Sequence, residues 1–317
     1  MKLVSAFFQL IRWPNLFFIA LTQWLFYNCV VYALYKNAPE NHQQHSGIFY
    51  LLIAASVFIA AAGYIINDYF DMHIDAVNKP GKVVVDRMVK RRWAIVWHLL
   101  FSFAGVLLSL YISYKTVKCV IFLANTACVF ILWLYSTRFK KKLLSGNIVI
   151  AALTAWVIVV VYFYAGASFI SYSGWNPGTY PFNIRQLYKF TILYAGFAFI
   201  VSLIREVVKD MEDMYGDARY HCNTMPIAWG VPATKVFAAV WIVVCVGALL
   251  IVQLYAWQSG WWISAVYCIL LIVLPLVMIL RKLYKAVTPL HYHQISSLIK
   301  LVMFTGILSM IFFKFFA

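Results

Sequence analysis

The feature that most constrains this chain is a series of nine long apolar runs. Their approximate ranges are 15–35, 49–67, 93–113, 117–135, 147–169, 187–208, 234–256, 261–280 and 297–316. Each has roughly 19–23 residues, and about 20 helical residues cross a hydrocarbon core ~30 Å thick. Inside a bilayer an unpaired backbone polar group is costly, which favours helices for runs of this length. The pattern predicts an all-α integral membrane protein with nine transmembrane helices, forming one domain over residues 1–317.

Composition supports a bilayer environment and argues against nucleic acid as a partner. The chain is 64% hydrophobic and only 11% charged, whereas soluble domains carry about 25% charged residues. The net charge is +16, but the basic residues are scattered over short connections between apolar runs. A nucleic-acid-binding protein would gather them on one face or in one block.

The distribution of lysine and arginine predicts the orientation in the membrane. The even-numbered connections are rich in both residues, as in Arg87 to Arg92 and Arg138 to Lys142, whereas the odd-numbered connections hold only isolated cations such as Lys36 and Lys115. Cytoplasmic loops carry the excess of positive residues. The N-terminus is therefore expected in the cytoplasm and the C-terminus outside.

The acidic residues are gathered in two segments. Of the ten Asp and Glu residues, only Glu40 lies in an odd-numbered connection, and the other nine lie in two segments at or after the ends of the second and sixth apolar runs. Asp68, Asp71 and Asp75 have the spacing i, i+3, i+7, and the second segment repeats it with Asp210, Asp213 and Asp217. On a helix these offsets place three carboxylates on one face.

Three like charges on one helix face repel each other, and anions near a helix C-terminus oppose the macrodipole. A bound divalent cation would offset both effects. Magnesium typically takes one or two carboxylates together with substrate phosphates. Cations suited to the remaining phosphate oxygens are Lys209, which adjoins the second segment, Lys140 after the fourth run and Arg12 before the first. The two segments therefore predict a magnesium and phosphate site on the cytoplasmic side.

The same residues carry a family resemblance. The stretch NDYFDMHID from Asn67 to Asp75, followed by Asn78-Lys79-Pro80, resembles the first aspartate motif of the UbiA superfamily of membrane prenyltransferases. The stretch REVVKDMEDMYGD from Arg205 to Asp217, followed by TMPI, resembles the second. Two departures are Lys82, where an arginine is usual, and the His221-Cys222 pair, where small residues are usual.

The resemblance implies a nine-helix bundle with a cytoplasmic cap over the active site, and Mg²⁺ as cofactor. It implies metal ligation by Asn67, Asp71 and Asp75 for one ion and by Asp210, Asp213 and Asp217 for the other. The catalytic set comprises six aspartates, the five among these ligands together with Asp68, and Asp68 is the expected base for the acceptor. The residues expected to bind the donor diphosphate are Arg12, Asn15, Lys82, Arg87, Tyr135, Lys140, Arg205 and Lys209.

The implied reaction moves a polyprenyl group, expected to be geranylgeranyl, from its diphosphate to a hydroxyl acceptor through an allylic carbocation. The second motif is most similar to that of digeranylgeranylglyceryl phosphate synthases, which indicates a prenylated glycerol phosphate as acceptor. An aromatic acceptor of quinone biosynthesis, hydroxybenzoate or dihydroxynaphthoate, is the alternative. A cation transporter is the alternative outside enzymes, although transporters usually place such acids near the membrane midplane.

Overall fold

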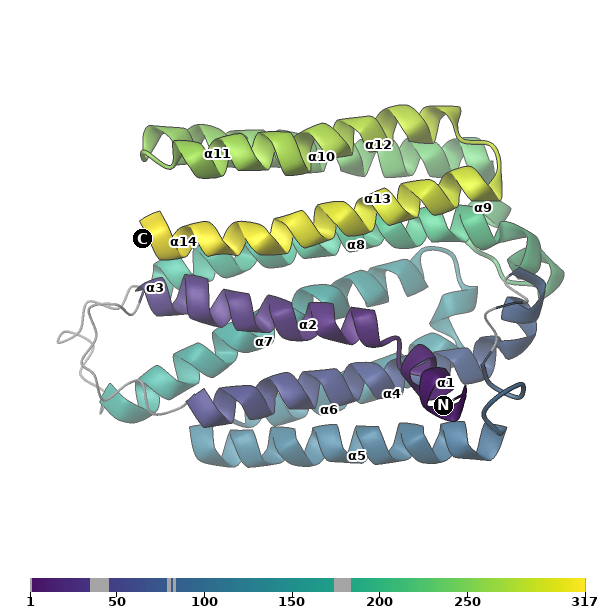
Figure 1. Ribbon diagram of the computed structural model, residues 1–317, viewed down its shortest axis with the longest axis horizontal. Coiled ribbons are helices and arrows are strands. Elements are labelled where there is room, and N and C mark those ends of the chain that lie inside the picture. Colours follow the sequence, from purple (N-terminus) through teal and green to yellow (C-terminus); the bar gives the residue numbers. More distant parts are fainter. Residues whose placement is uncertain (1, 35–45, 79–80, 82–83, 174–183, 317) are drawn as a thin grey trace. The chain divides into compact units, whose positions relative to one another are not determined.

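The computed structural model describes residues 2–34, 46–78, 81, 84–173 and 184–316 (Figure 1). This part of the chain is helical apart from its connections and an isolated bridge between Val85 and Val89. It contains nine helices long and apolar enough to cross a membrane. Their bounds are Trp13–Leu34, Gly47–Asn78, Arg91–Thr116, Cys119–Thr137, Ser145–Gly166, Ile184–Arg219, Gly230–Gln258, Trp262–Lys285 and Pro289–Phe315. The predicted number and order of spans are confirmed.

The chain forms two compact units. Unit 1 is Met1–Arg138 with Trp156–Ile192, and unit 2 is Phe139–Ala155 with Leu193–Ala317. Two of the three boundaries fall inside continuous helices, α7 (Ser145–Ser173) and α8 (Ile184–Arg219), and the third lies between Arg138 and Phe139. That residues 1–317 act as one functional domain stays a prediction.

Unit 1 is organised around helix α4 (Ser46–Asn78), which packs on α2 (Trp13–Leu25), α5 (Arg91–Thr116) and α6 (Cys119–Thr137). The first span consists of α2, the π-helical segment η1 (Phe26–Val31) and α3 (Tyr32–Leu34). A short helix that the apolar pattern did not indicate, α1 (Lys2–Leu10), precedes it. Its buried residues Ala6 and Leu10 pack against Ile65 of α4, so α1 belongs to the core of this unit.

Unit 2 packs α8 with α10 (Gly230–Gln258), α12 (Leu274–Lys285) and α13 (Pro289–Leu308) around one buried cluster. The eighth span joins α11 (Trp262–Cys268) to α12 through the π-helical segment η4 (Ile269–Val273). Shorter elements are η3 (Phe139–Lys141), α9 (Met225–Ala228), η5 (Ser309–Phe312) and α14 (Phe313–Phe316). Gly306 of α13 lets Phe197 approach closely, because a Cβ there would lie 2.4 Å from the ring.

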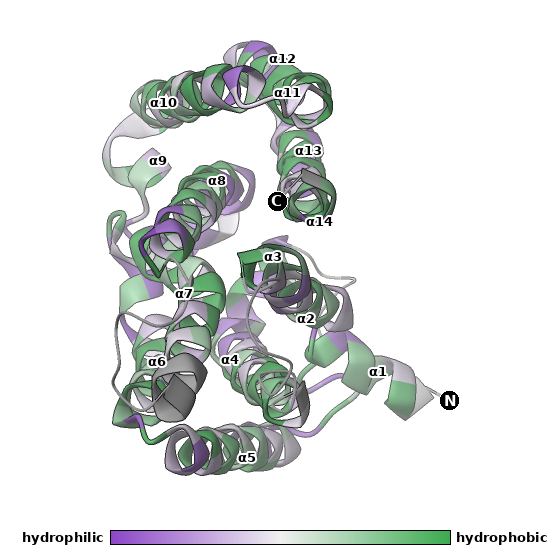
Figure 2. Ribbon diagram, turned by 90° about the vertical axis from the view of Figure 1, so that its left-hand side faces the viewer, coloured by the Kyte–Doolittle hydropathy of each residue, from purple (hydrophilic) through white to green (hydrophobic). Residues whose placement is uncertain are grey.

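Helix α5 has small and hydroxyl residues on its buried side and large apolar residues on its exposed side. Helix α5 buries Ser102, Gly105 and Ser109, yet Leu99 and Phe103 are 60% and 64% exposed. Hydrophobic residues also dominate the ribbon of α10 (Figure 2), where Ile251 is 70% exposed. Such exposed surface marks an interaction or membrane face, and small or hydroxyl residues are typical of helix contacts within lipid. The arrangement is that of an integral membrane protein.

One buried amide joins three helices of unit 1. Asn125 of α6 donates from Nδ2 to Ser109 Oγ of α5 at 2.9 Å, and its Oδ1 accepts from Trp156 Nε1 of α7 at 3.0 Å. Asn125 is 2% exposed. Interhelical hydrogen bonds of this kind contribute roughly 0.6–2 kcal/mol in membranes. The two bonds of Asn125 join α5, α6 and the part of α7 that belongs to unit 1.

Candidate functional site

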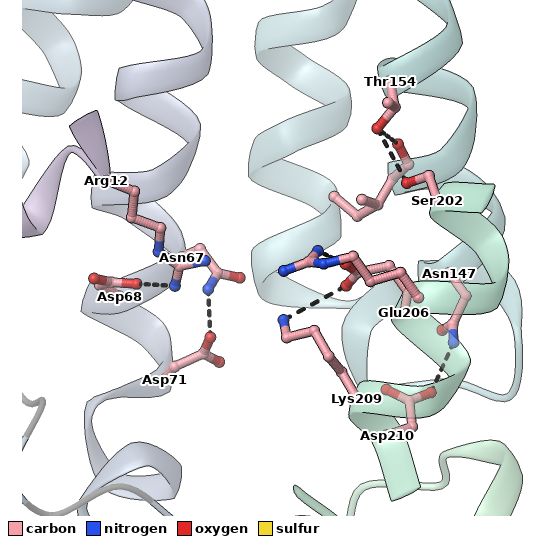
Figure 3. A network of polar contacts seen from close by, with 12 residues as sticks. Arg12, Asn67, Asp68, Asp71, Asn147, Thr154, Ser202, Glu206, Lys209 and Asp210 are labelled. Carbon is pink, nitrogen blue, oxygen red and sulfur yellow. Dashed lines mark hydrogen bonds and ion pairs between the residues drawn. The ribbon is translucent and has the colours of Figure 1, made fainter. Parts of the chain in front are cut away.

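The first acidic segment lies on the continuous helix α4, which extends beyond the predicted end of its apolar run as far as Asn78. Because this segment is helical, Asn67 and Asp71 stand one turn apart, and Asn67 Nδ2 donates to Asp71 Oδ2 at 2.5 Å (Figure 3). Asp71 is 3% exposed, and Asn67 Oδ1 is buried with no hydrogen-bond partner. The pair therefore holds an ordered carboxylate beside an amide oxygen that still has both lone pairs to offer.

Arg12 joins the start of the first span to this segment. Its Nη2 lies 2.6 Å from Asp68 Oδ1, and its guanidinium lies over the Tyr64 ring at 5.2 Å. Burial would lower the pKa of Arg12, but the charges of Asp68 and Asp71 and the hydrogen bond to Asp68 raise it above its ordinary value. Arg12 also has a left-handed backbone (φ 52°) between α1 and α2, and such backbone strain often occurs at functional positions.

The second acidic segment lies on α8, which likewise continues past its apolar run, to Arg219. Asn147, in the first turn of α7, donates from Nδ2 to Asp210 Oδ2 at 2.7 Å (Figure 3). Asn147 is 7% exposed and Asp217 is 6% exposed, whereas Asp213 is half-buried. Each acidic segment thus has one carboxylate oriented by the amide of an asparagine.

Glu206 lies between two of the predicted phosphate-binding cations. Its carboxylate is 2.6 Å from Arg205 Nη1 and 3.7 Å from Lys209 Nζ, and its side chain is only 12% exposed. Arg205 Nε is buried with no hydrogen-bond partner, so its N–H group is available to donate to a further anionic partner. The sequence reading did not assign Glu206 a role, although its spacing to Lys209, i and i+3, indicates an ion pair on a helix.

Lys140 lies in a tightly held connection of unit 2. A Cβ on Gly146 would lie 2.9 Å from the Phe139 carbonyl oxygen and 3.1 Å from Lys140 Cα, so only glycine allows η3 to pack on the start of α7. The Asn223 backbone N–H donates to the Lys141 carbonyl at 2.9 Å. These contacts fasten the lysine-bearing connection to α7, whose Asn147 contacts Asp210, and to the loop after α8.

The remaining predicted residues are placed as follows. Asp68 and Asp75 of α4, Asn15 in the first turn of α2 and Tyr135 near the end of α6 are all half-buried. Arg87 is exposed in the turn between α4 and α5. Lys82 lies outside the residues that the structure describes.

The described donors suit magnesium, although no three His, Cys, Asp or Glu side chains among the residues described form a metal-binding group. Magnesium needs only one or two carboxylates and takes its other ligands from water and substrate phosphates. The unpartnered Oδ1 of Asn67 beside Asp71 provides a hard oxygen donor of the required kind. The residues therefore fit a weakly coordinated magnesium ion that is completed by its substrate.

Comparison with known proteins identifies the family of this chain. A profile described as the UbiA prenyltransferase family matches residues 29–290. The chain is 31% identical over 224 residues to digeranylgeranylglyceryl phosphate synthase of Methanoregula boonei, covering 71% of each protein. It is 28% identical over 278 residues to the enzyme of the same name from Sulfurisphaera tokodaii, covering 88% of each.

Solved structures share the fold. One, from work on digeranylgeranylglyceryl phosphate synthase in membranes, superposes with a TM-score of 0.59 at 22% identity over 98% of this chain and 99% of that chain. A UbiA homolog from Archaeoglobus fulgidus bound to DMAPP and Mg²⁺ gives a TM-score of 0.56 at 16% identity, over 96% of this chain and 98% of that chain. At these identities the likeness concerns the helical architecture.

Proposed function

Because the chain belongs to the UbiA prenyltransferase family, we propose that it transfers a geranylgeranyl group from its diphosphate to the free hydroxyl of a prenylated glycerol phosphate. The protein is a membrane prenyltransferase similar to digeranylgeranylglyceryl phosphate synthases. The observation that carries the proposal is the pair of asparagine–aspartate contacts, Asn67 with Asp71 and Asn147 with Asp210, one in each acidic segment.

We propose that both acidic segments bind Mg²⁺ for the donor diphosphate, as supported by the homolog bound to DMAPP and Mg²⁺. In the first segment Asn67, Asp71 and Asp75 would provide ligands, and in the second Asp210, Asp213 and Asp217. Magnesium, when bound, neutralises the charge that develops on the departing diphosphate. The asparagine partners fix the carboxylates before the substrate arrives, which reduces the reorganisation that the transition state requires.

The cationic residues would bind the remaining phosphate oxygens. Arg205 keeps an unpartnered Nε, and Glu206 holds both Arg205 and Lys209 in position. We assign Arg205, Lys209 and Lys140 to anion binding. Arg12 contacts Asp68 and would bind the diphosphate only as part of that ion pair. The predicted contributions of Asn15, Lys82, Arg87 and Tyr135 to diphosphate binding stay predictions.

The allylic carbon–oxygen bond of the donor breaks, and its electron pair leaves with the diphosphate. The hydroxyl oxygen of the acceptor then forms a bond to the resulting allylic carbocation and loses its proton to a base. Asp68 stays the predicted base, and its carboxylate is paired with Arg12 in the structure.

Purified protein in detergent, incubated with labelled geranylgeranyl diphosphate, magnesium and separate acceptors, tests the proposal. We expect a labelled diether product with geranylgeranylglyceryl phosphate, and at least a ~100-fold loss of rate in Asp71→Asn and Asp210→Asn. Transfer to hydroxybenzoate or dihydroxynaphthoate alone would reassign the acceptor. Absence of transfer to every acceptor would contradict the proposal as a whole.

We also propose that the N-terminus lies in the cytoplasm, the C-terminus outside, and the acidic segments on the cytoplasmic side. The support is the lysine and arginine content of the even-numbered connections. The acidic segments lie at those ends of the second and sixth spans that lead into these connections.

A further inference from the structure

Helix α1 lies across the direction of the spans that it contacts. Figure 2, in which α4 and α5 are seen end-on, shows α1 extending sideways from them, and Figure 1 agrees. The helix has nine residues and is therefore about 14 Å long, which is less than half of the ~30 Å hydrocarbon layer. A helix of this length and direction can lie in the plane of a membrane.

The chain turns from α1 into the first span at Arg12. The Arg12 backbone N–H donates to the Gln9 carbonyl at 3.1 Å, and the Asn15 backbone N–H donates to the Arg12 carbonyl at 2.8 Å. Arg12 itself has a left-handed backbone, and a left-handed residue commonly ends a helix. The change of direction between α1 and α2 is therefore set by the local backbone.

Two sides of α1 contact other helices of unit 1. Ala6 and Leu10 are buried in one cluster with residues of α4. The ring centroid of Phe7 lies 5.1 Å from that of Trp97 and 6.2 Å from that of Phe101, both on α5. These two rings lie six and ten residues after the start of α5, about 9 and 15 Å along it. Phe7 therefore marks the side of α1 that faces the middle of the spans.

The other two sides of α1 are exposed and differ in polarity. The side opposite Phe7, about 180° away at 3.6 residues per turn, carries Ser5 and Gln9, and both are exposed. The side that faces away from α4 carries Val4 and Phe8, which are 61% and 47% exposed. A helix that borders water on all its exposed sides would carry polar residues on each of them. Helix α1 instead has a polar side toward the ends of the spans and an apolar side that points away from the protein.

Lipid is the partner that suits the exposed apolar side. The apolar surface continues along the chain into the first span, where Trp13 and Phe17 of α2 are exposed. Trp93 at the start of α5 and Trp133 near the end of α6 are exposed at the same end of unit 1. Tryptophan is enriched where the hydrocarbon layer meets the aqueous phase. The level of α1 along the spans therefore corresponds to the membrane boundary.

Helix α1 is also coupled to the first acidic segment. Leu10 and Ile11 belong to one buried cluster with Met72, which lies within that segment. Arg12 follows directly, and its Nη2 lies 2.6 Å from Asp68 Oδ1. A displacement of α1 would therefore move Arg12 relative to Asp68.

From these contacts we propose that α1 is an in-plane membrane helix, whose exposed apolar side, Val4 and Phe8, inserts into lipid at the headgroup boundary. Interfacial helices bury their apolar face about 5–10 Å into this boundary. The polar side, Ser5 and Gln9, faces water. The lipid contact of α1 keeps Arg12 in its ion pair with the first acidic segment. The placement of α1 is independent of the proposed function, whereas its effect on donor binding rests on that function.

Spin labels report the surroundings of α1 directly. Val4, Ser5, Phe8 and Gln9 are replaced one at a time by cysteine in a Cys119→Ser background, because the other five cysteines are buried. Each labelled protein is reconstituted in vesicles of phosphatidylcholine and phosphatidylglycerol. We expect the ratio of accessibility to oxygen over accessibility to a water-soluble nickel chelate to be higher at Val4→Cys and Phe8→Cys than at the other two positions, because oxygen partitions into lipid.

Two results of the labelling would overturn the inference. One is a ratio at positions 4 and 8 no higher than the ratio at positions 5 and 9, because α1 would then have no side in lipid. The other is low accessibility of positions 4 and 8 to both reagents, because a protein partner or a second copy of the chain would then cover the apolar side.

A charge on the apolar side tests the effect on donor binding. We expect Phe8→Asp to raise the KM for the donor about two- to fivefold, the factor that corresponds to loss of a partly exposed ion pair. Ser5→Asp is the matched control with the same charge on the polar side, and it should keep the wild-type KM, as should Phe8→Leu. An unchanged KM in Phe8→Asp would overturn this effect and leave the proposed function standing. Absence of wild-type transfer to every acceptor would instead reject the proposed function, and the labelling result does not depend on it.

Discussion

At the scale of single residues, two asparagines control how the acidic side chains are presented. Asn67 contacts Asp71 within one helix, and Asn147 of α7 contacts Asp210 of α8. In both cases an amide N–H occupies one carboxylate oxygen and leaves the rest of the group to other partners. Partners of metal ligands typically affect metal affinity about 10–100-fold when they are removed.

Asn147→Ala is therefore expected to raise the magnesium concentration for half-maximal activity by about 10–100-fold. The reason is that Asp210 loses the hydrogen bond that fixes its orientation. Titration of prenyl transfer against magnesium measures the effect, with Thr154→Ala as control, since Thr154 also joins α7 to α8 through Ser202 at 3.2 Å. A magnesium dependence equal to that of the wild type would contradict the assigned role.

Arg12 allows a second prediction. Arg12→Lys keeps the charge but loses the planar fork and the stacking on Tyr64, whereas Arg12→Gln also loses the charge. We expect the KM for the donor to rise in both variants, and more in Arg12→Gln. Equal KM values in the two variants would show that the charge of Arg12 is irrelevant to donor binding.

Ionisation of Arg12 should not contribute to the pH dependence of the transfer rate. The pKa of Arg12 in the folded protein is raised above the ordinary arginine value. The stabilisation that its charge provides is therefore complete when the pH is below the ordinary pKa, and it is lost only when the pH rises through the raised pKa. Between about pH 6 and 9 the group stays protonated. The wild type and Arg12→Lys should therefore give parallel pH–rate curves, and a difference in their apparent pKa values would contradict this.

At the scale of helices, close packing in unit 1 depends on glycine. A Cβ on Gly105 of α5 would lie 2.6 Å from Ile59 Cγ1 and 3.2 Å from the Ala55 carbonyl oxygen, both on α4. Overpacking of this kind costs about 1–3 kcal/mol. The contact therefore makes Gly105 a sensitive point in the α4–α5 interface.

Gly105→Ala is expected to lower the unfolding temperature in detergent, because α4 and α5 must separate to admit the methyl group. Gly247→Ala in α10 is the matched control, since a Cβ there has no neighbour within 4 Å. It should leave the unfolding temperature unchanged or slightly higher, as alanine favours helix. Equal unfolding temperatures of the two variants would show that the close α4–α5 contact at Gly105 does not determine the stability of the protein.

The sequence predicts the helices better than it predicts their ends. Each apolar run corresponds to one span because its length matches a bilayer. Hydropathy cannot mark the true ends of α4 and α8, because acidic residues leave the apolar run without breaking the helix. The short helix α1 was missed because Lys2–Leu10 is too short for a span and its apolar residues pack inside unit 1.

The same limit applies to the site. The acidic residues and their family resemblance are visible in the sequence, and the family is confirmed. The contact between Asn147 and Asp210 joins residues 63 positions apart. Such a pairing arises from helix packing in three dimensions, so no local spacing indicates it.

At the scale of the whole molecule, nine spans predict that the two termini lie on opposite sides of the membrane. We expect a reporter fused to the N-terminus to be active in the cytoplasm and one fused to the C-terminus to be active outside. A thiol reagent offers a second readout after cysteines are introduced at Arg87 and, separately, at Tyr114. Labelling of Arg87→Cys from outside intact cells would contradict the proposed orientation.

Helix α8 has 36 residues and is therefore about 54 Å long, well beyond the ~30 Å hydrocarbon layer. We therefore expect its acidic end at the aqueous boundary. The proposed amphiphilic donor would then react there without its head group leaving the aqueous boundary. Substrate encounter becomes a two-dimensional diffusion process, and the rate should depend on the mole fraction of donor in the bilayer, so that diluting it with inert lipid slows turnover even when its bulk concentration is constant.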